Sequence, residues 1–162
     1  MLGVELSTTS YIHEGLAFSV DGVGTIPANT ATTFLGRIGD LPIHFHGFEV
    51  SSSLGPITIE LIEAPAVSNA GTPIISYNKN RLSDNKSTMK AYSGATITGG
   101  TVIGTRKIHA IGGGSLTQGG EASFDTEWVL APNKDYAFRI TNGDTNTAAS
   151  FAVKFFYYEL EL

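Results

Sequence analysis

The sequence of 162 residues contains no cysteine, so it can form neither a disulfide bond nor a thiolate metal site. It has no basic residue before Arg37 and no long apolar run, and its start therefore predicts neither a secretory signal peptide nor a membrane-spanning helix. Helical periodicity is scarce as well, because 19 glycines and frequent threonine and serine residues interrupt the chain. These absences together favour a globular domain built from strands.

Charge is distributed unevenly along the chain. Residues 1–78 carry one base and seven acids, and residues 108–162 carry three bases and seven acids, whereas residues 79–107 carry six bases and one acid. A chain with a net charge of −5 is poorly suited to general nucleic-acid binding, which needs an extended basic surface. The basic segment is expected either to be a solvated loop or to face an acidic protein partner. Its candidate contact residues are Lys79, Arg81, Lys86 and Lys90.

Apolar and polar residues alternate with a period of two in several segments. In residues 57–63, Ile57, Ile59 and Leu61 fall on one face of a strand. Residues 126–141 predict a hairpin, with strands at 128–130 and 136–141 around a proline-led turn. Further strands are expected at residues 11–20, 30–37, 43–53, 86–93, 102–110 and 151–159. This spacing predicts an all-β fold, a two-sheet antiparallel β-sandwich with the jelly roll as its specific topology.

The strands predict a single domain over residues 11–162, preceded by an N-terminal arm over residues 1–10 that orders on binding. Residues 64–85 predict a long ordered connection with one extended piece at Ile74–Tyr77, and residues 112–120 predict a flexible loop.

The C-terminal strand, residues 151–159, is apolar on both faces, so it needs cover on both sides from a sheet, a loop or a neighbouring subunit. Phe156 and Tyr158, on its less apolar face, are candidates for a subunit interface in a dimer or trimer.

The stretch "IHFHGFE" contains the pattern His-x-His, which places His44 and His46 on one face of a strand. Cupins, which are jelly-roll metalloproteins, use such a pair with a following glutamate and a third histidine from a second motif. Here the spacing differs: Glu49 comes three residues after His46, on the opposite face unless a bulge at Gly47 shifts the register. His109 has no second motif around it. The histidines are therefore interpreted as structural, and no metal, cofactor or catalytic residue is predicted.

Four segments carry a resemblance to a known group of proteins: "LGPITIELIEAP", "AGTPIISYNKNRLSDNKS", "EWVLAPNKDYAFRITN" and the final "FFYYE". They resemble small virion proteins of tailed bacteriophages, described as capsid decoration (cement) proteins or phage structural proteins. The resemblance covers roughly residues 40–160 and includes no active-site motif.

This resemblance implies a non-enzymatic β-sandwich on the outer surface of the virion capsid, assembled in the host cytoplasm, with the major capsid protein as partner. It implies binding to neither nucleic acid nor membrane. One alternative is a head- or tail-fibre module that binds a host glycan through Tyr77, Asn78 and Asn80. A second alternative is a cupin-like metal-dependent enzyme.

Overall fold

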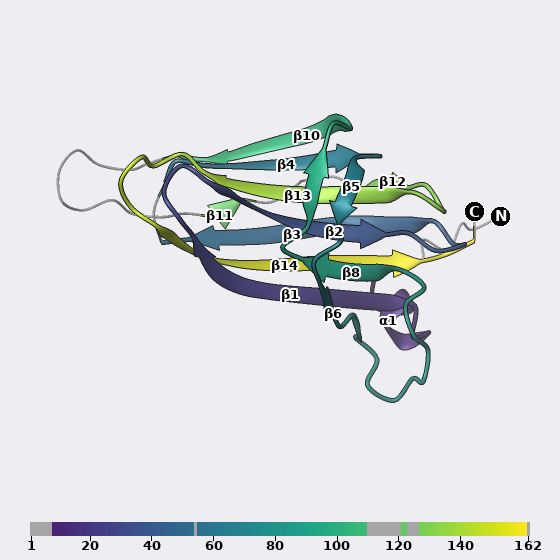
Figure 1. Ribbon diagram of the computed structural model, residues 1–162. Coiled ribbons are helices and arrows are strands. Elements are labelled where there is room, and N and C mark those ends of the chain that lie inside the picture. The colour runs from purple at the N-terminus through teal and green to yellow at the C-terminus, as the bar shows by residue number, and fades with distance from the viewer. Residues whose placement is uncertain (1–7, 54, 110–120, 123–126, 162) are drawn as a thin grey trace.

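The computed structural model describes residues 8–53, 55–109, 121–122 and 127–161, and two packed antiparallel sheets form its body (Figure 1). The chain is thus an all-β sandwich, as the alternation predicts. The first sheet, sheet A, has the order β11–β3–β14–β1–β7, with β12 also paired to β3. Its strands are β11 (Glu121–Ala122), β3 (Ile43–Ser52), β14 (Ala149–Glu159), β1 (Ala17–Ile26), β7 (Tyr77–Asn78) and β12 (Trp128–Leu130).

The second sheet, sheet B, has the order β10–β4–β13–β2–β8–β6. Its strands are β10 (Thr101–Ile108), β4 (Ile57–Glu63), β13 (Asp135–Asn142), β2 (Ala31–Arg37), β8 (Lys90–Ser93) and β6 (Thr72–Ile74). A small separate sheet pairs β5 (Ala66–Asn69) with β9 (Thr96–Thr98). The short helix α1 (Thr8–His13) precedes β1. Among the described residues, no helix is long and apolar enough to cross a membrane.

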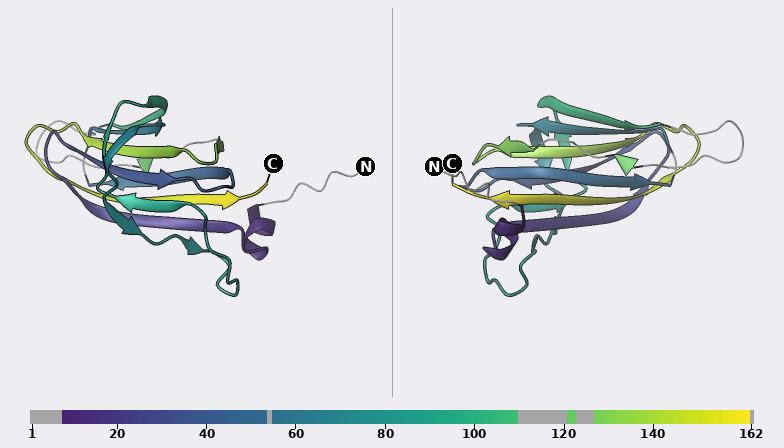
Figure 2. Two further views of the ribbon diagram at one scale, coloured as in Figure 1. Left: turned by 45° about the vertical axis from the view of Figure 1, so that its right-hand side comes forward. Right: turned by 180° about the vertical axis from the view of Figure 1, so that it is seen from behind.

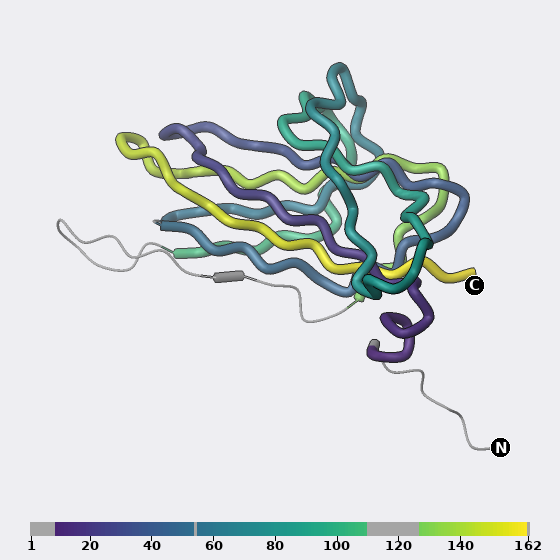
Figure 3. Tube along the Cα trace, turned by 90° about the horizontal axis from the view of Figure 1, so that it is seen from below, coloured from purple at the N-terminus to yellow at the C-terminus, as the bar shows by residue number. Residues whose placement is uncertain are grey.

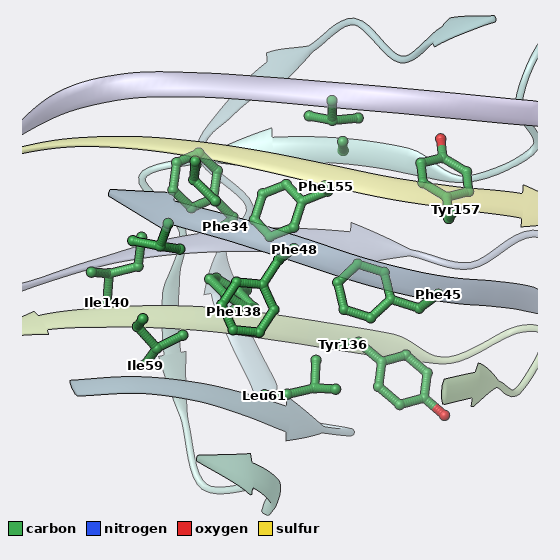
Figure 4. Packing of buried hydrophobic residues seen from close by; sticks show 14 of the residues in the cluster. Phe34, Phe45, Phe48, Ile59, Leu61, Tyr136, Phe138, Ile140, Phe155 and Tyr157 are labelled. Carbon is green, nitrogen blue, oxygen red and sulfur yellow. The ribbon is translucent and has the colours of Figure 1, made fainter. Parts of the chain in front are cut away.

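The core between the sheets is dominated by aromatic rings (Figure 4). Phe138 of β13 meets Phe48 of β3 edge-to-face at 4.6 Å between ring centroids, and Phe155 of β14 at 4.8 Å. Phe34 of β2 meets the same Phe155 at 5.5 Å. Edge-to-face contacts add about 0.5–1.5 kcal/mol each to the burial of the rings themselves. The two sheets are therefore joined by rings that interdigitate across the interface.

The outer face of sheet B is covered in part by the chain between β4 and β10. Leu35, Ala137 and Ile62 lie side by side in the ladder and alternate with core residues, so they point away from the other sheet. They are nevertheless at most 1% exposed. A Cβ added to Gly100 would lie 2.7 Å from Ile62 Cγ2, which shows how closely this segment crosses the sheet. In Figure 1, β5 runs across the strands of sheet B rather than along them.

Three expectations about local structure are corrected. Residues 8–13 are helical, so β1 begins at Ala17 instead of residue 11, and Thr8–Ser10 belong to α1. The rest of the expected arm, residues 1–7, and the expected loop at 112–120 lie outside the described residues. The connection 64–85 contains three short strands, β5, β6 and β7, rather than one extended piece.

The expected hairpin at 126–141 is the third correction. Its two strands form at Trp128–Leu130 and Asp135–Asn142, but they do not pair with each other. β12 pairs with β3 in sheet A, whereas β13 pairs with β2 and β4 in sheet B. The turn between them therefore crosses from one sheet to the other. Leu130 and Tyr136, at either end of this crossing, are both buried in the core, which requires the two strands to approach it from opposite sides.

Candidate interaction surface

Residues 75–89 form a projection between β6 and β8 that extends beyond β1 (Figure 1). It contains three exposed large apolar side chains, Ile75, Tyr77 and Leu82, which are 65%, 52% and 97% exposed. Three of the chain's ten Lys and Arg residues, Lys79, Arg81 and Lys86, also lie in it. Such a combination of apolar and cationic groups on one protruding segment is typical of a binding surface.

Asn78 fixes the base of the projection. It is buried, and its side-chain amide donates to the carbonyl oxygens of Gly15 at 2.8 Å and Asn85 at 3.0 Å. Its Oδ1 accepts from the backbone N–H of Asn80 at 2.9 Å. One side chain thus joins the two limbs of the projection to the turn that precedes β1.

Asn80 repeats this arrangement one step further out. Its amide donates to the carbonyl of His13 at the end of α1, at 2.9 Å, and its Oδ1 accepts from Leu82 N–H at 3.0 Å. Figure 2 shows α1 and the projection at the same end of the molecule in both views. The exposed Leu82 is therefore held by a loop whose backbone is tied to the rest of the fold.

Glu159, at the end of β14, fixes the other limb. It is 4% exposed, and its carboxylate accepts from Thr88 N–H at 2.9 Å, Met89 N–H at 3.3 Å and the Ser87 hydroxyl. Ser87 also bonds the hydroxyl of Tyr157 at 2.8 Å. Burial raises the pKa of Tyr157 to about 12, so this phenol stays neutral. The backbone bonds to Glu159 explain why β8 begins only at Lys90 and not at residue 86.

The four predicted contact cations are all exposed. Lys79 and Lys86 follow the two bonded residues Asn78 and Asn85, so they lie on adjacent limbs of the projection. The Lys79 ammonium lies 4.2 Å from the ring centroid of Phe156, and the Arg81 guanidinium lies 5.8 Å from that of Tyr77. The structure brings Lys79, Arg81 and Lys86 into one segment.

Lys90 lies apart from these three, because it is on β8, opposite Arg37 in sheet B. A contact of any of the four with an acidic partner stays a prediction.

Tyr158 and Phe156, the predicted subunit interface, lie on the outer face of sheet A under cover from their own chain. Tyr158 is 7% exposed and stacks on Tyr11 of α1 at 4.4 Å and on His44 at 5.0 Å between ring centroids. Phe156 is half-buried beneath Lys79, with His46 at its edge. The second apolar face of β14 is thus covered by α1 and the projection. A role in subunit contacts stays a prediction.

The histidine stretch contains a bulge next to Gly47, which is the condition under which the sequence allowed Glu49 to share a face with His44. Phe156 pairs with Gly47 and Tyr157 with Phe45, so His46 is the extra residue. Phe45 and Phe48 both face the core in consequence, and Glu49 points to the same outer face as His44. Glu49 lies opposite Lys154 in the ladder rather than beside the histidines.

Glu127, and not Glu49, is the carboxylate that lies next to the histidines. His44 Nδ1 donates to Oε1 of Glu127 at 2.7 Å, and the Tyr158 hydroxyl donates to Oε2 of the same carboxylate. His46 Nδ1 lies 3.9 Å from this Oε2. His109 follows β10, which is a strand of the other sheet. Within the described ranges, no three His, Asp or Glu side chains are placed to hold a metal ion. The cluster ties the start of β12 to β3 and β14.

An apolar cavity of about 60 Å³ lies between the sheets. It is bordered by Phe45, Leu61, Phe138 and Phe155 and, at one side, by Ile74 and Met89. Its volume is far below the roughly 300 Å³ at which ligand pockets begin. No charged side chain borders it.

Two of the three residues proposed to bind a glycan, Asn78 and Asn80, use their side-chain amides in hydrogen bonds to the backbone of their own chain. The side-chain amides of Asn78 and Asn80 each donate to and accept from backbone groups, as described above. A sugar hydroxyl would have to displace those bonds. Tyr77 remains exposed, with Arg81 over its ring.

The sequence did not predict the structural roles of Asn78, Asn80, Glu127 and Glu159. Asn78 and Asn80 of "YNKNRLSDN" carried a usable signal, because Asn side chains bond the backbone two residues ahead in turns, as both do here. Glu159 and Glu127 carried none. Glu159 accepts from Thr88, which is 71 residues away in the sequence, and Glu127 accepts from Tyr158 and His44, which are 31 and 83 residues away. Periodicity does not reveal contacts at such separations.

Comparison with known proteins gives little. No protein-family model and no curated protein matches the sequence. One solved structure that is weakly similar is "The 2.6A structure of Infectious Bursal Virus Derived T=1 Particles", with 11% identity over 87% of this chain and a TM-score of 0.16. The chain spans 40% of the length of that viral chain. The function is therefore argued from the residues themselves.

The Glu127 cluster predicts an acid-sensitive contribution to stability. Partial burial acts to raise the pKa of Glu127, but hydrogen bonds from Tyr158 and His44 outweigh it and lower the pKa below 4.5. A carboxyl whose pKa is lowered by folding stabilises the fold above its unfolded pKa, and this is lost as pH falls through the folded value. Glu127→Gln is expected to lower the free energy of unfolding by about 0.5–1 kcal/mol at pH 7, after screening.

Denaturant unfolding at several pH values measures this difference. It should begin to shrink as pH falls below about 4.3, where the unfolded carboxyl takes up a proton, and should vanish only after pH has passed through the lower pKa of folded Glu127. The exposed Glu161→Gln serves as the control and should show no such trend. A difference that stays constant down to pH 3 would contradict the assignment.

Proposed function

We propose that this chain is a structural protein of a tailed-bacteriophage virion that binds the outer surface of the capsid shell and stabilises it without catalysing a reaction. Its partner would be the major capsid protein, and it would act as a homo-oligomer at the capsid surface after assembly in the host cytoplasm. Neither nucleic acid nor membrane is a proposed partner. The resemblance of residues 40–160 to phage decoration proteins supports this, together with the geometry of the projection.

The observation that carries the proposal is Leu82. A leucine that is 97% exposed on a loop fixed by side-chain to backbone hydrogen bonds has no role in its own fold. Burying such a side chain in a partner contributes about 1.5–3 kcal/mol. Because the loop is already ordered, little conformational entropy would be lost on binding. Leu82 is therefore suited to insert into an apolar socket on a neighbouring protein.

The charges around Leu82 define the complementary surface. Lys79, Arg81 and Lys86 lie in the same segment as Leu82, and Asp84 is the only acid of residues 75–89. An acidic partner surface would accelerate association and fix the orientation of the contact. A single contact of this size is weak, but several copies bound to one shell combine through multivalency.

The path of the chain supports the same class of protein. We infer a jelly roll from the strand order, because β12, β3, β14 and β1 face β10, β4, β13 and β2. This is the order that two Greek keys wound together produce.

Binding to undecorated capsids of the phage that encodes the chain tests the proposal. Leu82→Ala is expected to weaken binding about tenfold per site, the loss of roughly 1.4 kcal/mol. The double variant Lys79→Glu, Arg81→Glu should weaken it further and reduce its salt dependence. Val102→Ala and Lys107→Glu, which change exposed residues of β10, serve as matched controls. Unchanged affinity of both projection variants would overturn the proposal.

A further inference from the structure

The free edge of sheet A lies along β1. β14 pairs with all ten residues of β1, from Ala17 to Ile26. On the other side, β7 pairs only with Phe18 and Ser19. Among the described residues, no strand pairs with residues 20–26 on this side, so one edge of the strand is open there. Figure 3, which views the molecule from the side of β1, shows the teal segment crossing only one end of this strand.

The backbone groups along this edge can be identified. The Ala17 carbonyl accepts from Lys79 N–H on the β7 side, whereas the Leu16 carbonyl accepts from Glu159 N–H on the β14 side. Backbone groups of alternate residues point to the same side of a strand. The N–H and C=O groups of Asp21, Val23 and Thr25 therefore point to the open edge. The side chains of these three residues are exposed.

The other sheet edges in the described part of the chain are short or irregular. β10 has a bulge between Val102 and Gly104 and carries Arg106 and Lys107. β6 has three residues and contains Pro73, and β7, β11 and β12 have two or three residues each. These features prevent another chain from pairing with a sheet edge. The open part of β1 has no proline, no bulge in its register with β14, and one charge, Asp21.

We propose that two copies of this chain pair through this edge, antiparallel, about a two-fold axis at Val23. In that register Val23 faces Val23 of the second copy, and Asp21 faces Thr25. Each of these pairs exchanges two backbone bonds, about six in all. The Val23 side chain, 81% exposed in the single chain, packs against its counterpart. The Asp21 carboxylate accepts from the Thr25 hydroxyl across the interface. Sheet A thereby continues through both copies.

Self-complementarity selects both the partner and the register. The open edge, residues 20–26, is symmetric about Val23, so the incoming strand ends at Ile26 opposite Val20, next to β7. Pro27, which lacks an N–H, follows there and needs no ladder partner. A register centred on Gly22 or Gly24 would use only two of the three outward-facing residues of each copy. One centred on Asp21 would place two carboxylates opposite each other. This pairing does not depend on whether the chain binds a capsid.

The chain's lack of cysteine allows a direct test. Val23→Cys places the only thiol of each copy next to its counterpart, because facing residues in such a pair have Cα atoms about 5.5 Å apart, within disulfide range. Under mild oxidation the full-length variant is expected to form a covalent dimer rapidly. Val129→Cys, at the other exposed valine of sheet A, which is 51% exposed on β12, should cross-link far more slowly.

Sedimentation equilibrium measures the reversible dimer. Val23→Asp places like charges at the two-fold axis and is expected to raise the dimer dissociation constant at least tenfold, whereas Val102→Asp should leave it unchanged. Thr25→Lys, which would face Asp21, should lower it. A chain that is monomeric up to near-millimolar concentration would overturn the proposal. So would an oligomer that is insensitive to Val23→Asp and does not cross-link through Val23→Cys.

Discussion

Phe138→Ala is expected to lower the free energy of unfolding by about 3–5 kcal/mol, which is a large share of the roughly 5–15 kcal/mol that stabilises a domain. Phe138 is 4% exposed and lies between Phe34 and Leu61 in the ladder of sheet B. Its ring meets Phe48 and Phe155 of the opposite sheet edge-to-face. Truncation would remove both contacts and leave a cavity that the surrounding rings, fixed by their own strands, fill only in part.

Denaturant unfolding followed by tryptophan fluorescence measures the loss, because Trp128 is the single tryptophan and packs against the core. Tyr77→Ala is the control, since it truncates an aromatic ring that is 52% exposed, and it should cost less than about 0.5 kcal/mol. A loss below 1.5 kcal/mol for Phe138→Ala would show that the sheets do not depend on this ring cluster.

The sequence was sufficient to predict the strands whose residues alternate strictly. β4 forms at residues 57–63 as expected, with Ile57, Ile59 and Leu61 in the core. β14 matches its expected range closely, and its second apolar face is indeed covered. In both cases a period-two pattern fixes which side chains enter the core, and a slip by one residue would expose all of them.

Where local signals and tertiary contacts compete, the sequence was misleading. "APNKD" has the residues of a hairpin turn, but β12 and β13 belong to different sheets, because their pairing is decided by β3, β2 and β4. Glu49 comes three positions after His46, a spacing that in a regular strand puts the two side chains on opposite faces. The bulge next to Gly47 places Glu49 on the same face as His44 instead.

The candidate surface was predicted in part. The charge of the basic segment was evident from composition, and the structure places three of the four predicted contact cations in the projection. The exposed tip at Leu82 was not predicted, because a leucine in a polar stretch has no periodic partner. The open edge of β1 was not predictable either, since the neighbours of a strand depend on the topology of the whole sheet.

Glu159→Ala is expected to lower the free energy of unfolding by about 2–4 kcal/mol and to release one limb of the projection. The buried carboxylate accepts from Thr88 N–H, Met89 N–H and the Ser87 hydroxyl, and alanine offers none of them an acceptor. Bonds to a charged acceptor are stronger than bonds to a neutral one, so the loss exceeds that of an ordinary hydrogen bond. Hydrogen exchange should show faster exchange at the amides of Thr88 and Met89.

The same variant connects the fold to the proposed function. If a rigid projection is what makes Leu82 an effective contact, Glu159→Ala should weaken capsid binding even though residue 159 touches no partner, because the loop must then be ordered during binding. Glu161→Ala, an identical change two residues later at an exposed position, should affect neither stability nor binding. Glu159→Gln, which keeps one acceptor oxygen, should lie between the two. Loss of stability without faster exchange at Thr88 and Met89 would mean that Glu159 supports the sheet rather than the projection.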